Sequence, residues 1–183
     1  AGNRIPLPAS AASLTPASAA MGRSLAEAAS AADAISFGGT KAGLIFGEAI
    51  VFTRAELAEG ALHLRKQSMQ LASKMRFVAA QFEALLAGER WRQSAGHANA
   101  MAQRLAERVR EISGITITQK VQANVVFAIL PPGVAERLQR DWFFYTWDEA
   151  TGEVRWMCSW DTTEEDVDTF AAAVEEAVGS PVR

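Results

Sequence analysis

The sequence is poor in the residues that build metal centres and disulfides. It has one cysteine, Cys158, which therefore has no partner for an intramolecular disulfide. The two histidines, His63 and His97, lie far apart in the sequence, and CxxC and HExxH spacings are absent. We therefore expect neither a disulfide framework nor a bound metal ion.

The sequence also lacks a strong excess of one charge and a long apolar run. The net charge of the 183 residues is −3 at pH 7, which provides no basic surface for nucleic acid. No apolar run approaches the roughly 20 residues that span a bilayer. Pro6, Pro8 and Pro16 interrupt any apolar segment of a secretory signal. We expect a soluble, cytoplasmic protein without nucleic-acid or membrane partners.

The first half of the sequence predicts a short sheet followed by long helices. Alanine, serine and proline dominate residues 6–34, with a helix-compatible pattern from Leu14 to Ala34. We expect strands at 34–37 and 48–52 around a glycine-rich turn. Residues 54–113 have an almost entirely helical composition, with a capping box of Thr53 and Glu56 at the start. Breaks are expected at Gly88 and Gly96, and Gly114 is expected to end the last helix.

The second half predicts a small α/β unit, because the apolar period changes after Gly114 from helical to strand-like. We expect strands at 115–118 and 121–130, a short helix at 134–140, a hairpin of 142–147 with 153–160, and a final helix that ends near Val178.

The segment SFGGTKAG, from Ser36 to Gly43, has the most specific chemistry. Capture of an aldehyde needs a lysine amine that sheds its proton near neutral pH, and partial burial of Lys41 at the end of a strand would favour this. The glycines let the backbone approach a flat ring closely, and the hydroxyls of Ser36 and Thr40 can reach a phosphate. On its own, a lysine after Gly-Gly-Thr is more typical of a solvated turn.

Five segments together resemble a known family. They are SFGGTKAG (36–43), RKQSMQLASKMRFVAAQ (65–81), HANAMAQRLAERV (97–109), QANVVFAILP (122–131) and VRWMCSWDTTEEDVDTF (154–170). In this order they resemble the C-terminal half of low-specificity threonine aldolases and phenylserine aldolases, in the aromatic amino-acid β-eliminating lyase and threonine aldolase family. The resemblance covers nearly everything from Ile35 onward.

The resemblance implies the α/β architecture of fold type I pyridoxal-phosphate enzymes, here truncated. Residues 1–113 would be a remnant of the large cofactor-binding domain, with 1–34 degenerate or disordered. Residues 114–183 would be the complete small C-terminal α/β domain. The full-length parent would be a homodimer or homotetramer.

The resemblance also implies the site residues. Lys41 would hold pyridoxal 5'-phosphate through its amine, with Thr40 and Ser36 beside it. The electron-poor ring would accept the electrons released when the Cα–Cβ bond of a β-hydroxy-α-amino acid breaks, giving glycine and an aldehyde. Arg155 matches the arginine that binds the substrate carboxylate; the alternative is an exposed strand arginine opposite a carboxylate.

Two further basic residues match the family less specifically. Lys66, and with a less secure alignment Arg76, correspond to basic side chains near the cofactor. For both of them, an ordinary solvated helix face is the alternative.

The sequence departs from the family near its start. Ser10 and Ser13 stand where the family has an aspartate for the ring nitrogen and an arginine for the phosphate. A serine cannot keep that nitrogen protonated, so we expect little or no activity from this chain alone. A broken or frame-shifted gene would explain these residues, as would a paralogue that has lost its catalysis. The alternative functions are a non-catalytic remnant that docks on a full-length homologue and a related β-eliminating lyase.

Overall fold

The computed structural model describes residues 8–10 and 14–180. The chain forms two compact units, one up to Ala95 and one from Gly96 onward. Within the described residues, no helix is both long enough and apolar enough to cross a bilayer.

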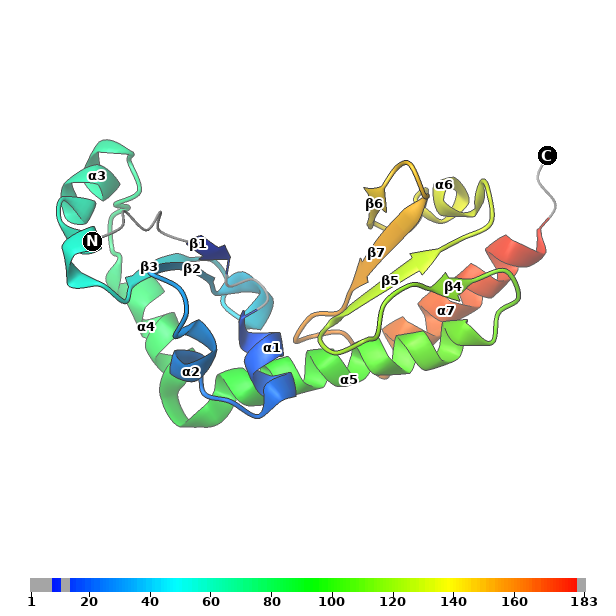
Figure 1. The fold of residues 1–183 in the computed structure, drawn as a ribbon, viewed down its shortest axis with the longest axis horizontal. Coiled ribbons are helices and arrows are strands. Elements are labelled where there is room, and N and C mark those ends of the chain that lie inside the picture. Colours follow the sequence, from blue (N-terminus) through cyan, green and yellow to red (C-terminus); the bar gives the residue numbers. More distant parts are fainter. Residues whose placement is uncertain (1–7, 11–13, 181–183) are drawn as a thin grey trace. The chain divides into compact units, whose positions relative to one another are not determined.

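A three-stranded sheet organises the first unit (Figure 1). Its strands are β1 (Pro8–Ser10), β2 (Ala34–Gly38) and β3 (Glu48–Phe52). The central strand β2 runs parallel to β1 and antiparallel to β3. The two strands expected from the sequence are therefore confirmed, and the described part of residues 1–34 adds a third strand. The helical pattern expected from Leu14 to Ala34 forms two short helices, α1 (Leu14–Met21) and α2 (Leu25–Ala29).

The core of the first unit forms on one face of β2. Side chains alternate along this strand, so that Ile35 and Phe37 are buried while Ser36 is exposed. The other buried members come from the helices and from the turn after β2, and they are Ala29, Ala42, Leu44, Leu85 and Trp91.

The helical part of the first unit is less continuous than we expected. Its elements are η3 (Ala55–Ala58), α3 (Ala61–Gln67), α4 (Arg76–Leu86) and η4 (Ala87–Glu89). Residues 68–75 are not helical, and Met69 and Lys74 have positive φ values of 55° and 62°. We did not expect this break from the apolar residues at helical spacing, because residues 68–75 contain neither glycine nor proline.

Two of the expected helix boundaries are wrong. Thr53 caps no helix, because its hydroxyl donates to the carbonyls of Ala32 and Asp33, at 2.6 and 3.0 Å. Gly96 breaks no helix either, since it lies inside α5 (Arg90–Arg110). The break at Gly88 is confirmed, with non-helical backbone angles of φ 59° and ψ 40°.

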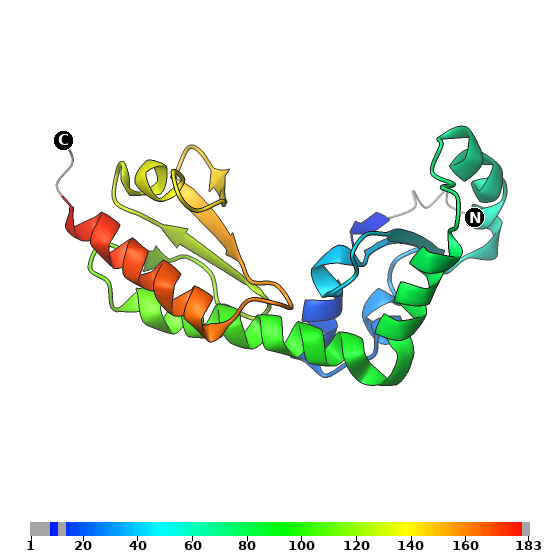
Figure 2. The same cartoon turned by 180° about the vertical axis from the view of Figure 1, so that it is seen from behind.

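The second unit is a four-stranded antiparallel sheet with two long helices on one face (Figures 1 and 2). Its strands are β4 (Thr116–Ile117), β5 (Val125–Ile129), β6 (Tyr145–Asp148) and β7 (Glu153–Met157), in the spatial order β4-β5-β7-β6. The C-terminal part of α5 and α7 (Glu164–Gly179) cover one face, and α6 (Val134–Leu138) follows β5. We expected a domain boundary at 113/114, whereas the division into compact units falls at 95/96, because Met101, Leu105 and Val109 of α5 belong to this core.

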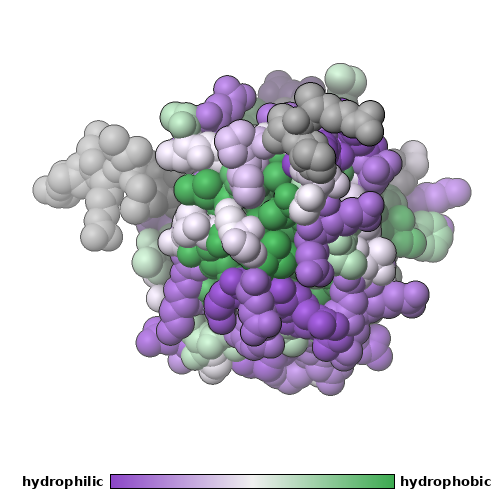
Figure 3. All heavy atoms as spheres, turned by 90° about the vertical axis from the view of Figure 1, so that its right-hand side faces the viewer, coloured by the Kyte–Doolittle hydropathy of each residue, from purple (hydrophilic) through white to green (hydrophobic). Residues whose placement is uncertain are grey.

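The core of the second unit follows from strict alternation along its two central strands. Val126 and Ala128 of β5 and Val154 and Trp156 of β7 are at most 3% exposed, and they face α5 and α7. Their neighbours in the sequence are half-buried on the other face of the sheet. On the side where α6 and the end of α7 lie, hydrophobic residues gather at the centre of the surface and hydrophilic ones border them (Figure 3).

The two long helices of this unit are joined by an ionic cluster. Asp168 of α7 accepts hydrogen bonds from Arg104 at 2.8 and 3.1 Å and from Arg108 at 3.0 Å. Both guanidinium groups, through these bonds and their charge, hold the pKa of the Asp168 carboxyl well below its usual range. Thr163 and Asp166 form a capping box at the start of α7.

Replacing Asp168 with Asn is expected to destabilise the second unit at pH 7, because Arg108 loses its carboxylate partner and Arg104 keeps only Glu164. A folded-state pKa below the unfolded value of about 3.9 means that this stability is fully present above about pH 4 and is lost as the pH falls below it. Urea unfolding should therefore show a smaller difference between wild type and Asp168→Asn at pH 3 than at pH 7. The control Asp141→Asn changes an exposed carboxylate without a side-chain hydrogen bond among the described residues. A difference that is the same at both pH values would contradict the assignment.

Candidate functional site

The turn that follows β2 is held by backbone hydrogen bonds. The Gly39 amide donates to the carbonyl of Gly47 at 3.1 Å, and the Gly39 carbonyl accepts from the amides of Ala42 and Leu44 at 2.9 and 3.1 Å. These bonds enclose a single turn of 3₁₀ helix, η2 (Thr40–Ala42). The backbone of residue 41 is therefore fixed from both sides.

Close packing at Gly39 fixes the turn further. A Cβ atom on Gly39 would lie 2.3 Å from Cδ2 and 3.1 Å from Cβ of Leu44. Leu44 and Ala42 are 6% and 5% exposed, so the core holds both ends of the turn. Gly43 closes η2 in the left-handed region, with φ 108°. Only glycine at positions 39 and 43 allows this compact turn.

Lys41 lies on this turn with its side chain exposed. It makes no ion pair or side-chain hydrogen bond with any residue that the structure describes. The partial burial that we expected for Lys41 is not observed, because the buried members of the turn are Ala42 and Leu44 on either side of Gly43. The result is an unpaired amine on a rigid support.

The two hydroxyl groups expected near Lys41 differ in their surroundings. Thr40 is exposed and adjacent to Lys41. Ser36 is also exposed, but its Oγ donates a hydrogen bond to Glu48 Oε2 at 3.3 Å. A phosphate at Ser36 would meet the charge of Glu48, so Thr40 is the better placed of the two for an anion.

The parallel pairing of β1 with β2 places Ser10 at the same end of the sheet as Lys41. Ser10 is in register with Ser36, and both strands end at that edge. The carboxyl edge of parallel strands is where ligands bind in open α/β sheets. Ser13, the other departure from the family, lies outside the described residues.

Lys66 and Arg76 lie on separate helices of the first unit. Lys66 is exposed in the last turn of α3, and Arg76 begins α4 with its guanidinium carbon 4.8 Å from the centre of the Phe77 ring. Neither forms a hydrogen bond or ion pair with the Lys41 turn within the described residues. Their role at a cofactor therefore stays a prediction.

Arg155 lies in the middle of the second unit's sheet, on the face opposite to the core. Its guanidinium carbon is 4.8 Å from the centre of the Trp147 ring and 6.0 Å from that of Tyr145. Its Nε is buried, and no described residue accepts a hydrogen bond from it. The described residues also give Arg155 no ion pair. The described residues therefore do not support the alternative interpretation, in which Arg155 is a strand arginine opposite a carboxylate.

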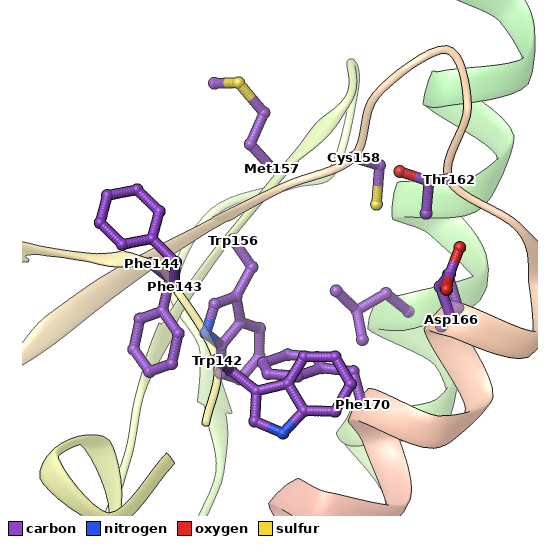
Figure 4. Close-up of a pocket in the computed structure, with 11 residues that line it drawn as sticks. Trp142, Phe143, Phe144, Trp156, Met157, Cys158, Thr162, Asp166 and Phe170 are labelled. Carbon is purple, nitrogen blue, oxygen red and sulfur yellow. The ribbon is translucent and has the colours of Figure 1, made fainter. Parts of the chain in front are cut away.

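The second unit also has a partly open cavity of about 160 Å³ between its sheet and α7 (Figure 4). Trp142, Trp156 and Phe170 supply aromatic walls, and Cys158 lies at the other side. Burial raises the pKa of the Cys158 thiol to about 11, so the thiol is not a nucleophile near neutral pH. We therefore assign this cavity no catalytic role. Within the described chain, no three His, Cys, Asp or Glu side chains cluster as a metal site would.

Replacing Gly39 with Ala is expected to destabilise the protein by about 1–3 kcal/mol, because the new Cβ would overlap buried Leu44. The matched control is Gly96→Ala, inside α5, where an added Cβ meets no atom within 4 Å. Alanine there should stabilise the protein by roughly 0.5–1 kcal/mol. Chemical unfolding of both variants measures this difference in sign, and a neutral Gly39→Ala would show that the turn is not tightly packed.

Comparisons with known proteins agree with this architecture. A sequence model of the beta-eliminating lyase family matches residues 3–130. The low-specificity L-threonine aldolase of Pseudomonas aeruginosa is 43% identical over 149 residues, which are 81% of this chain and 43% of that protein. The enzyme of the same name from another Pseudomonas is 42% identical over the same shares. The chain thus spans less than half the length of these curated relatives.

Solved structures show the same relationship. Leishmania major threonine aldolase superposes with a TM-score of 0.79 at 29% identity, over 96% of this chain and 52% of that one. The match with serine palmitoyltransferase of Sphingomonas wittichii covers 85% of this chain and 43% of that one, at 18% identity and a TM-score of 0.62. At this identity the match shows the fold alone. The expected fold type I architecture of pyridoxal-phosphate enzymes is confirmed.

The range matched by the family model extends upstream of Ile35, where we expected the resemblance to begin. It includes β1 and the alanine- and serine-rich segment. With Lys41 also inside that range, the chain belongs to the beta-eliminating lyase family and is related to the low-specificity L-threonine aldolases over part of their length.

Proposed function

We propose that this chain contributes residues to a pyridoxal-phosphate site for aldol cleavage of β-hydroxy-α-amino acids. Threonine, allo-threonine or phenylserine would give glycine and an aldehyde. The observation that carries the proposal is Lys41, an exposed and unpaired amine on a turn held by backbone bonds at the carboxyl edge of β1 and β2. The names of the Pseudomonas relatives support this choice of reaction.

The donor groups on the described residues fit pyridoxal phosphate at its aldehyde and its phosphate. Lys41 offers an amine to the aldehyde, and Thr40 offers an exposed hydroxyl to the phosphate. Lys66 and Arg76 are proposed to add positive charge near the phosphate, whereas Ser36 would first have to leave Glu48. The ring nitrogen is not matched, because Ser10 stands at the position where the family has an aspartate.

Bound pyridoxal phosphate supplies an electron-poor ring that accepts the electron pair of the breaking Cα–Cβ bond. Lys41 Nζ would hold the cofactor at its aldehyde carbon. The amine of Lys41 would also serve as a base that moves a proton near the reacting atoms. Arg155 binds the α-carboxylate with planar N–H donors that no described residue occupies. The chain's own residues therefore attach the cofactor and orient the substrate.

A non-catalytic role is the second candidate, and two observations favour it. Ser10 weakens the electron sink at the ring nitrogen. In the first unit, the large apolar side chains of Ile45, Leu62 and Met69 are 84%, 75% and 88% exposed, so contact with another chain would remove them from water. In this alternative the chain docks on a full-length homologue.

We also propose that the parent protein assembles as a dimer or tetramer. A related β-eliminating lyase would use the same residues on a different substrate.

Lys41 is predicted to be the lysine that pyridoxal phosphate labels first. Incubation with the cofactor, borohydride reduction and peptide mapping by mass spectrometry measure the labelling of all four lysines, which are Lys41, Lys66, Lys74 and Lys120. Lys41→Ala should remove most of the label, whereas the control Lys120→Ala should leave it in place. Equal labelling of all four lysines would contradict the proposed site.

The purified 183-residue chain is predicted to cleave threonine little or not at all, because Ser10 cannot keep the ring nitrogen protonated. Acetaldehyde release in a coupled assay, with a Pseudomonas relative as the positive control, measures this. Cleavage at a rate comparable to that of the relative would show that Ser10 does not limit catalysis. Cofactor labelling at Lys41 without cleavage is the expected combination.

A further inference from the structure

We propose that Trp147 and Tyr145 are positioning residues for Arg155. Their rings hold the guanidinium group in place and leave its N–H donors free for the carboxylate of an amino-acid substrate. This inference rests on the proposed function of Arg155, and it adds the groups that orient the arginine.

The register of the sheet surrounds Arg155 with aromatic residues. Phe127 of β5 and Tyr145 of β6 are both paired with Arg155 of β7, one on each side. The core residues Val154 and Trp156 flank Arg155 in sequence, so Arg155 and its two partners share the opposite face of the sheet. A row of ring, guanidinium and ring thus crosses three strands.

A β-bulge adds Trp147 to this row. Thr146 is paired with Val154 and Asp148 with Glu153, so that Trp147 is an extra residue on the edge strand β6. A bulge of this kind changes the direction in which a side chain points. The Trp147 ring lies 4.8 Å from the guanidinium carbon of Arg155 and makes an edge contact with Phe127, at 5.5 Å between ring centres. Phe127 therefore supports Trp147 against Arg155.

The aromatic rings restrict the position of the Arg155 guanidinium group, as a carboxylate does for other arginines of the second unit. Arg104 and Arg108 are both bonded to Asp168, and their donors are therefore in use. The face of an aromatic ring attracts a guanidinium group without accepting its in-plane hydrogen bonds. Trp147 and Tyr145 thus restrict the position of Arg155 while its donors stay available, and Nε has no acceptor among the described residues.

Arginine side-chain NMR tests the positioning in the full 183-residue chain without any ligand. The Arg155 Nε–H signal is identified by its loss in Arg155→Lys. We expect its exchange with water to become about threefold to tenfold faster in Trp147→Leu, as expected for the loss of a cation–π contact. Trp147→Phe should restore part of the protection. The matched control is Trp160→Leu, because Trp160 is also an exposed tryptophan, at 43% against 54% for Trp147, and has no ring contact with Arg155 among the described residues. Unchanged exchange in both Trp147→Leu and Tyr145→Leu would overturn the inference.

A pair of ligands tests what the positioning is for. Phosphopyridoxyl-glycine carries a carboxylate arm, and pyridoxamine phosphate lacks it, so the ratio of their affinities measures the contribution of the carboxylate. We expect wild type to prefer the glycine adduct, and Trp147→Leu to reduce this preference by about threefold to tenfold. The affinity for pyridoxamine phosphate should not change in that variant.

The outcomes separate the inference from the proposed function. If wild type shows no preference for the glycine adduct, the proposed role of Arg155 fails, and the inference fails with it. If the preference is present, disappears in Arg155→Gln, and survives unchanged in Trp147→Leu and Tyr145→Leu, only the inference fails. Partial loss in the two ring variants, with no loss in Trp160→Leu, supports both.

Discussion

The packing of Leu44 against the backbone of Gly39 is the contact on which the candidate site depends. It brings the chain back onto the core directly after β2, so that the intervening turn has one compact conformation. The buried side chains Ala42 and Leu44 hold that turn, and Lys41 between the glycines is left exposed. The rigid backbone therefore holds a free amine at a fixed place on the surface of the first unit.

The second unit places its arginines in two different kinds of surroundings. Arg104 and Arg108 join two helices through Asp168, which occupies donors of both. Arg155 lies among aromatic rings and keeps its donors. A carboxylate beside Arg155 would compete with a substrate carboxylate, so the aromatic surroundings are what a binding arginine needs.

Sequence patterns predicted most strands because alternation and glycine positions are local properties. β2, β3 and the sheet of the second unit follow from them, as does the position of the turn that contains Lys41, whereas the exposure of Lys41 does not. The non-helical residues 68–75 were missed, because Met69 and Lys74 adopt positive φ angles that their residue types do not suggest. Trp147 beside Arg155 was missed for a different reason: a bulge is set by pairing between strands, and the spacing within one strand does not encode it.

The most direct test of the central claim is a ¹³C NMR spectrum of the chain mixed with pyridoxal phosphate labelled at its aldehyde carbon. We predict that the signal of this carbon leaves its free-aldehyde position in wild type and keeps that position in Lys41→Ala. An aldehyde signal that is the same in both proteins would contradict the claim that Lys41 is the residue that holds the cofactor.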